Sequence, residues 1–132
     1  MSEPCVCISL RKASRKLTAR YDAALEAAGI NLAQFSLLRS IARLGPVSLT
    51  ALSEVTELDR STLGRNVRVL ERLRLVAIGG GEDQREAMLS LAPHGKTTLV
   101  TALPLWEGTQ HAIRTKLGAD GVAQLTALLG AL

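Results

Sequence analysis

The sequence predicts a mainly helical fold that carries one small β-hairpin. Over most of the chain, apolar residues recur at steps of three and four, the spacing of one buried helix face. Near the middle, two short segments of this kind flank a brief turn, and the spacing then changes to two around a glycine-rich stretch. This order is that of a winged helix-turn-helix, in which we expect about six helices. The length of 132 residues and the 47% hydrophobic content favour a single domain, 1–132.

The first two predicted helices are separated by a glycine. The first covers about 5–28, and Gly29 follows it where a helix-ending glycine is common. Its apolar positions are Leu10, Ala13, Leu17, Tyr21, Ala24 and Ala28. Asn31 is predicted to cap the second helix, because Gln34 completes a capping-box pattern. That helix ends at Gly45. Its buried face comprises Leu32, Phe35, Leu38, Ile41 and Ala42.

Two shorter helices follow, with a tight turn between them. Ser48 is predicted to cap the first, and Asp59 to cap the second, which extends to about Arg74. The apolar positions of the second helix are Leu63, Val67, Leu70 and Leu73. Together the two segments form the predicted helix-turn-helix pair.

A β-hairpin is predicted directly after this pair. Val76 and Ile78 alternate with smaller residues, and the stretch 87–92 alternates in the same way on the return strand. Residues 79–83 form the expected tip, because consecutive glycines adopt positive φ readily.

Two further helices complete the chain. The first starts at Pro93 and runs to about Leu117, with Pro104 inside it as an expected kink, and Gly118 ends it. The last starts at about Asp120. Its apolar stripe is Val122, Leu125, Leu128, Leu129 and Leu132. Little sequence remains to cover this stripe, so we expect a two-fold symmetric dimer built mainly from the terminal helices.

The second helix of a helix-turn-helix pair enters the major groove and presents its N-terminal residues to base edges. The candidate DNA contacts on this helix are Arg60, Ser61, Thr62, Arg65, Asn66 and Arg68. An arginine can bond guanine, Asn66 can pair with adenine, and Thr62 can touch a thymine methyl. The alternative is a solvated helix face with ion pairs along the helix. The helix-turn-helix spacing favours DNA.

The predicted hairpin tip supplies a second candidate DNA contact. Asp83 and Arg85 lie there, beside three glycines. An arginine at this place can enter the minor groove or meet a phosphate. The alternative is an exposed hairpin whose charged tip serves solubility.

The chain resembles the MarR family of regulators over nearly its whole length. Residues 59–66 are similar to the recognition helix of that family, and residues 70–76 to the exit of this helix into the wing. The family's wing pattern is matched by Asp83, Arg85, Leu91 and Gly95. The resemblance implies that 5–28 and 93–132 are dimerisation helices and that 31–92 is the DNA-binding lobe. It also implies a palindromic DNA site and a crevice for aromatic carboxylates between the lobe and the dimer helices.

Three positions depart from the family pattern. Ala92 stands where the family prefers threonine, which removes a hydroxyl that would cap the following helix. Gly64 stands where a larger residue is commoner in the recognition helix. Arg74-Leu75 stands where Arg-Gly or Lys-Gly-Leu is usual. These departures concern the cap and the rigidity of helices rather than the fold.

The N-terminal cysteines resemble those of a Cys-bearing subgroup of the family. Two residues apart on a helix, Cys5 and Cys7 point away from each other, so a bond between them requires a non-helical segment. They could instead pair across a dimer or sense oxidants, since Arg11 can lower the pKa of Cys7. Metal binding with His94 or His111 has no support in the spacing. We favour two reduced, inert thiols.

Composition excludes several other classes of function. Few aromatic residues are present, which disfavours stacking on single-stranded nucleic acid. No apolar run approaches the ~20 residues of a membrane span, and we see no signal peptide, so we expect a cytoplasmic protein. No catalytic or phosphate-binding motif appears, so no enzyme activity, cofactor or metal is expected. The net charge of +4 is compatible with a polyanionic partner.

The predicted function is therefore that of a homodimeric, sequence-specific regulator that binds double-stranded DNA. We expect its affinity to respond to a small anionic or aromatic effector or to oxidation. The alternative is a winged-helix module that binds another protein and does not bind DNA.

Overall fold

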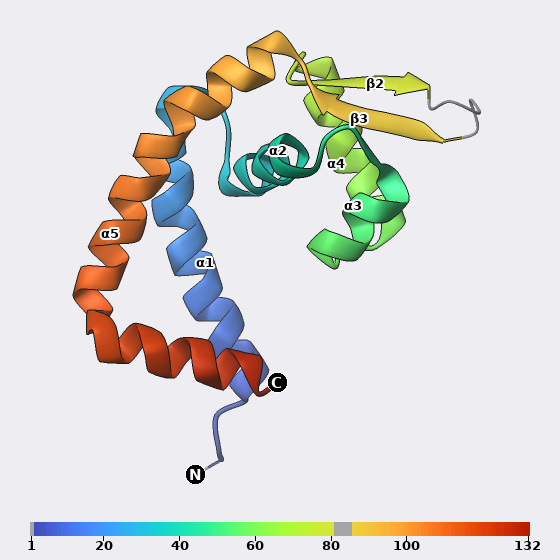
Figure 1. The fold of residues 1–132 in the computed structure, drawn as a ribbon. Helices are drawn as coiled ribbons and strands as arrows, with labels where there is room; N and C mark the ends of the chain where they lie inside the picture. Colours follow the sequence, from blue (N-terminus) through green and yellow to red (C-terminus); the bar gives the residue numbers. More distant parts are fainter. Residues whose placement is uncertain (1, 81–85) are drawn as a thin grey trace.

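The computed structural model describes residues 2–80 and 86–132. In chain order its elements are α1 (Val6–Leu25), the 3₁₀ turn η1 (Glu26–Ala28), α2 (Leu32–Leu44), β1 (Val47–Ser48), α3 (Leu49–Thr56), α4 (Arg60–Arg72), β2 (Val76–Gly80), β3 (Ala87–Leu91) and α5 (Pro93–Gly130). Helices α2 to α4 and the sheet gather into a lobe, and the long helices α1 and α5 lie beside it (Figure 1). The predicted fold class is confirmed.

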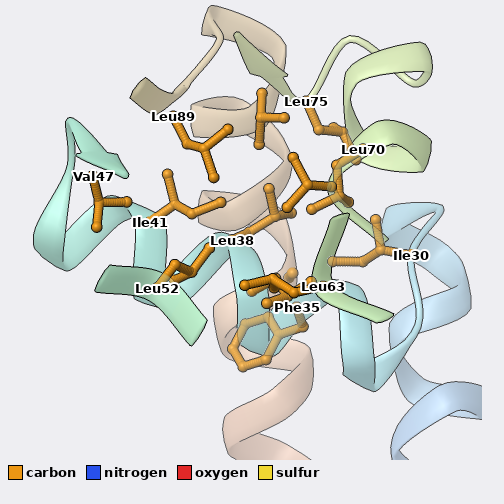
Figure 2. Close-up of a cluster of buried hydrophobic side chains, with 14 of the residues drawn as sticks. Ile30, Phe35, Leu38, Ile41, Val47, Leu52, Leu63, Leu70, Leu75 and Leu89 are labelled. Carbon is orange, nitrogen blue, oxygen red and sulfur yellow. The ribbon is translucent and has the colours of Figure 1, made fainter. Parts of the chain in front are cut away.

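The core of the lobe lies where its helices meet the sheet. Figure 2 shows Phe35, Leu38 and Ile41 of α2 converging with Leu52 of α3 and Leu89 of β3. The fully buried side chains are Leu25, Phe35, Leu38, Ile41, Leu52, Leu63, Leu70 and Leu89. The predicted inner faces of α2 and α4 thus supply five of these eight side chains.

Two predicted buried positions are wrong. Leu73 is 45% exposed, because α4 ends at Arg72 and helix periodicity places a residue on a face only as long as the helix continues. Ala42 is exposed although α2 continues to Leu44, because the buried face of α2 also includes Leu37 and is centred away from Ala42.

Side-chain caps start all three helices of the lobe, as predicted. Asn31 accepts from the backbone N–H of Gln34, and the Gln34 side chain accepts from the Asn31 N–H, so both halves of the capping box are present. Ser48 accepts from the backbone N–H of Ala51 at 3.1 Å. These bonds satisfy backbone donors that the first helical turn leaves free.

The sheet has one strand more than predicted. Strands β2 and β3 form the expected antiparallel hairpin, with Val76 opposite Leu91 and Gly80 opposite Ala87. Strand β1 adds to the free edge of β3, giving the order β1-β3-β2. A two-residue strand is too short to show an alternating pattern. We call the hairpin of β2 and β3 the wing.

The helix count also differs from the expected six, since the described part of the chain has five α-helices and one 3₁₀ turn. The last two predicted helices are joined in α5. Gly118 marks their boundary with φ 76° and ψ 160°, a conformation that is essentially restricted to glycine. The helix resumes directly afterwards and the chain turns sharply (Figure 1). None of the described helices is long and apolar enough to cross a membrane.

Polar contacts connect the terminal helices to each other and to the lobe. The Tyr21 hydroxyl of α1 donates to Gln110 Oε1 of α5, and burial raises the pKa of Tyr21. Asp22 of α1 accepts from the backbone N–H of Leu32, 2.8 Å away, at the start of α2. The first bond joins α1 to α5, and the second joins α1 to the start of α2.

A close backbone approach connects the wing to α5. The Leu75 carbonyl accepts from the Ala92 N–H at 3.0 Å. A Cβ added to Gly95 would lie 1.9 Å from the same carbonyl oxygen, so no residue with a side chain fits there without movement. This contact accounts for the glycine that the wing pattern places in the first turn of α5.

Candidate nucleic-acid interface

Helix α4 has one buried face and one free face. Leu63, Val67 and Leu70 are buried in the core. The opposite side of the helix carries a row of exposed residues at helical spacing, namely Ser61, Arg65, Arg68 and Arg72. We call these four residues the reading face. Its three arginines have no acidic residue among them.

The first turn of α4 is held by Asp59. One carboxylate oxygen accepts from the Thr62 backbone N–H at 2.8 Å and from the Ser61 hydroxyl at 2.7 Å. The other accepts from the Thr62 hydroxyl at 2.8 Å. The backbone bond, then the two hydroxyl bonds, lower the pKa of Asp59 to about 2. The carboxylate is therefore ionised at neutral pH, and Ser61 and Thr62 are held in place.

Arg65 lies against this turn. Its Nη2 donates to the Thr62 hydroxyl oxygen at 3.4 Å, a long contact. Thr62 thereby connects Asp59 to Arg65. The guanidinium is exposed and retains donors that can bond the edge of a guanine.

The other predicted contacts on α4 occupy three different places. Arg68 belongs to the reading face, and Arg60 is exposed at the first helical position. Asn66 is only partly exposed and lies on the flank of α4, away from the reading face. There it lines a cleft of about 540 Å³ together with Ser40 and Arg43 of α2. The structure therefore groups Ser61, Arg65 and Arg68 and separates Asn66 from them.

The predicted contacts at the wing tip, Asp83 and Arg85, lie outside the described residues. The strands that lead to them are described as far as Gly80 and Ala87. These strands extend away from the helices of the lobe (Figure 1).

One cluster was not expected from the sequence. The guanidinium of Arg39 lies 4.7 Å from the ring centre of Trp106 and 6.0 Å from that of Phe35. The two rings stack at 5.7 Å. Cation–π contact thus connects α2 to the middle of α5. Spacing along the sequence could not pair residues this far apart.

A second cleft, of about 570 Å³, lies between the end of α2, strand β3 and the first turns of α5. Its walls are mostly apolar and include Ile41, Leu91, Leu99 and Leu103. Lys96 is the charged residue in its lining. Such a cleft suits an apolar molecule that carries one negative charge.

The cysteines lie at the opposite end of the molecule from the wing. Cys5 is the residue before α1 and makes no side-chain cap bond, and Cys7 is in the first turn. Both are exposed free thiols. Among residues 2–80 and 86–132, no group of histidine, cysteine and acidic side chains is arranged to hold a metal.

Two helices joined by a tight turn, with arginines on the free face of the second and a β-hairpin after it, define a winged helix-turn-helix protein of the DNA-binding type. Comparisons with known proteins agree. The model of the MarR family matches residues 28–86. A comparison with curated proteins gave no match.

Solved structures give matches over almost the whole chain. The Mycobacterium tuberculosis transcriptional regulator MosR, in complex with DNA, is 33% identical, with 97% of this chain and 95% of that chain covered and a TM-score of 0.84. A second MosR structure is 31% identical, with 98% and 95% covered and a TM-score of 0.81. Escherichia coli MarR, as a mutant in complex with operator DNA, has a TM-score of 0.86 at 22% identity, with 96% and 91% covered, and shows the fold alone. The chain belongs to the MarR family of transcriptional regulators.

Proposed function

We propose that this chain is a homodimer that binds a palindromic site on duplex DNA and regulates transcription from it. The reading face carries the proposal, because Ser61, Arg65 and Arg68 project from the free side of a helix whose other side is fixed in the core. The structures of MosR and MarR with DNA support it by analogy.

The proposed dimer rests on apolar side chains that the single chain leaves in water. On the last turns of α5, Leu128 is 67% exposed and Leu129 is 48% exposed, and Leu132, just beyond the helix, is 87% exposed. At the start of α1, Val6 is 68% exposed and Ile8 is 53% exposed. A second copy would cover these side chains, because contact between two copies removes exposed apolar surface from water.

Sequence selection tests the DNA proposal. The chain is incubated with random duplexes, and bound sequences are amplified and reselected. We expect an enriched palindrome whose half-sites lie about one helical turn apart, with binding that weakens steeply as salt rises. A chain that neither enriches a sequence nor binds heparin or duplex DNA would instead be the protein-interaction module.

We propose that an apolar carboxylate in the Lys96 cleft modulates DNA binding. The cleft contacts both the lobe and α5, so an occupant can change how the two are oriented. Benzoate is a suitable first probe, with gel shift on the selected operator as the readout. Lys96→Met should abolish its effect, whereas Arg43→Met in the other cleft should not.

Oxidation of Cys5 and Cys7 is the second candidate signal. Both thiols are exposed, as an oxidant sensor requires. If they respond, peroxide should release the wild-type chain from its operator and leave a chain with both cysteines replaced by serine bound. Operator binding that ignores peroxide would identify them as inert thiols.

A further inference from the structure

Helix α4 has a position without a side chain, the partly exposed Gly64, on the flank that borders α3; we call it the bare position. Gly64 lies one turn after Arg60 and one turn before Arg68, so the three residues form one ridge along the helix. Both arginines are exposed. The ridge therefore carries a long cationic side chain at each end and no side chain between them.

The fold does not require a glycine at this position. Gly64 has no positive φ, and a Cβ built there would meet only Leu49 Cδ2, at 4.0 Å, which is an ordinary contact. Gly95 differs, since its added Cβ would lie 1.9 Å from a backbone oxygen. A glycine within a helix lowers helix stability relative to alanine. The missing side chain is thus explained neither by conformation nor by packing.

The bare position borders the seam between α3 and α4. Leu49, the nearest contact of a residue at position 64, is the first residue of α3. In helix-turn-helix proteins the first helix of the pair crosses the DNA backbone while the second enters the major groove. A DNA strand that lies along this seam would approach Gly64. The guanidinium groups of Arg60 and Arg68 could then bind its phosphates.

We propose that Gly64 forms a notch in which the sugar–phosphate backbone of duplex DNA lies directly against α4, between Arg60 and Arg68. The notch rests on the proposed DNA-binding function and adds a contact to it. It makes position 64 a determinant of how closely the recognition helix approaches DNA.

Substitutions that fill the notch test this proposal. Gly64→Ala and Gly64→Leu should raise the melting temperature by about 3–5 °C, because each replaces a helical glycine. Both should weaken binding to operator and to random duplex, by ~10-fold for alanine and more for leucine. Gly108→Ala is the matched control, since Gly108 is also helical and its added Cβ meets nothing within 4 Å. That variant should gain stability and bind DNA as the wild type does.

The outcomes separate the notch from the proposed function. If the wild-type chain binds DNA and both Gly64 variants bind equally well, the notch is wrong and the DNA-binding function stands. If the Gly64 variants melt below the wild type, the fold itself requires the glycine, and the notch is again wrong. A wild-type chain that binds no duplex overturns the proposed function instead.

Discussion

Helices α2, α3 and α4 of the lobe each begin with a side chain that accepts a hydrogen bond from the first helical turn, whereas α1 and α5 begin without one. The caps in the lobe are Asn31, Ser48 and Asp59. The residues at the same position in the terminal helices are Cys5 and Ala92. A capped helix is specified by its own sequence. The terminal helices depend more on what packs against them.

Burial differs in the same way. The lobe encloses the leucines on the inner faces of its helices, as Leu38, Leu52, Leu63 and Leu70 are 0% exposed. Helix α5 buries Ala102 and Ile113 but leaves most of its final leucines in water, and nothing in the described chain covers them. The core of the lobe is thus enclosed within one chain, whereas the terminal helices leave apolar side chains exposed that the proposed dimer would cover. Four predictions test this difference.

The largest effect is expected where the two regions join. Gly95→Ala would place a Cβ against the Leu75 carbonyl oxygen, and the backbone would have to move to relieve the overlap. We expect a loss of about 3 kcal/mol in the free energy of unfolding. Urea denaturation measures it, with Gly108→Ala as a control that should not destabilise. A Gly95→Ala chain as stable as the wild type would mean that the lobe does not depend on this junction.

The sequence predicted most of the lobe because its patterns are local. The caps at Asn31, Ser48 and Asp59 each involve residues three apart, and the inner faces of α2 and α4 follow from helical spacing. Strand β1 was not predicted, because it has only two residues and pairs with a strand that is distant in the sequence. The stacking of Trp106 on Phe35 was not predicted, because it joins residues that are far apart in the sequence.

The sequence predicted which kind of site the chain has, but it did not predict how all the site residues are arranged around α4. Residues of the first turns of α4 were identified together, yet the half-buried Asn66 lies on a different side of the helix from Arg65. The helical spacing of Asn66 from the buried leucines would have indicated this. Arg74 adopts φ 62° and Glu57 φ 57°, left-handed conformations that neither residue type predicts. Arg74 belongs to the pair Arg74-Leu75, which stands where the family usually has Arg-Gly or Lys-Gly-Leu.

The second prediction concerns the uncovered end of α5. Leu128→Glu combined with Leu129→Glu should weaken the dimer by ~100-fold, because charges would be buried in an apolar interface. Analytical ultracentrifugation over a concentration series measures this. Leu73→Glu is the matched control, since Leu73 is 45% exposed on the lobe and Leu129 is 48% exposed on α5. If all three chains dimerise equally, another surface holds the dimer.

The third prediction concerns the reading face. Arg65→Ala should cost ~1–3 kcal/mol in binding to the selected operator and relax the preference at one position in each half-site. Arg114→Ala, an exposed arginine on α5, is the control and should leave selectivity unchanged. Melting temperatures should stay close to that of the wild type in both variants, because both side chains are exposed. Unchanged selectivity in Arg65→Ala would show that α4 is not the element that recognises the sequence.

The smallest effect is expected from giving α5 the cap that it lacks. Ala92 already has φ −73° and ψ 163°, close to the −73° and 158° of Ser48, which does cap its helix. A serine at position 92 is therefore placed to accept from the backbone N–H of Gly95, three residues on, as Ser48 accepts from Ala51. Ala92→Ser should raise the free energy of unfolding by roughly 0.5–1 kcal/mol.

The same substitution inside the helix should act in the opposite direction. Ala112 is exposed in the middle of α5, where a serine would find no free backbone donor. Because serine has a lower helix propensity than alanine, Ala112→Ser should reduce the free energy of unfolding slightly. Urea midpoints of the two variants, measured at one protein concentration because the chain is a proposed dimer, give the comparison. A gain at position 92 and none at position 112 would show that local capping limits α5. Equal effects at both would show that packing against α1 and a partner already determines where α5 begins.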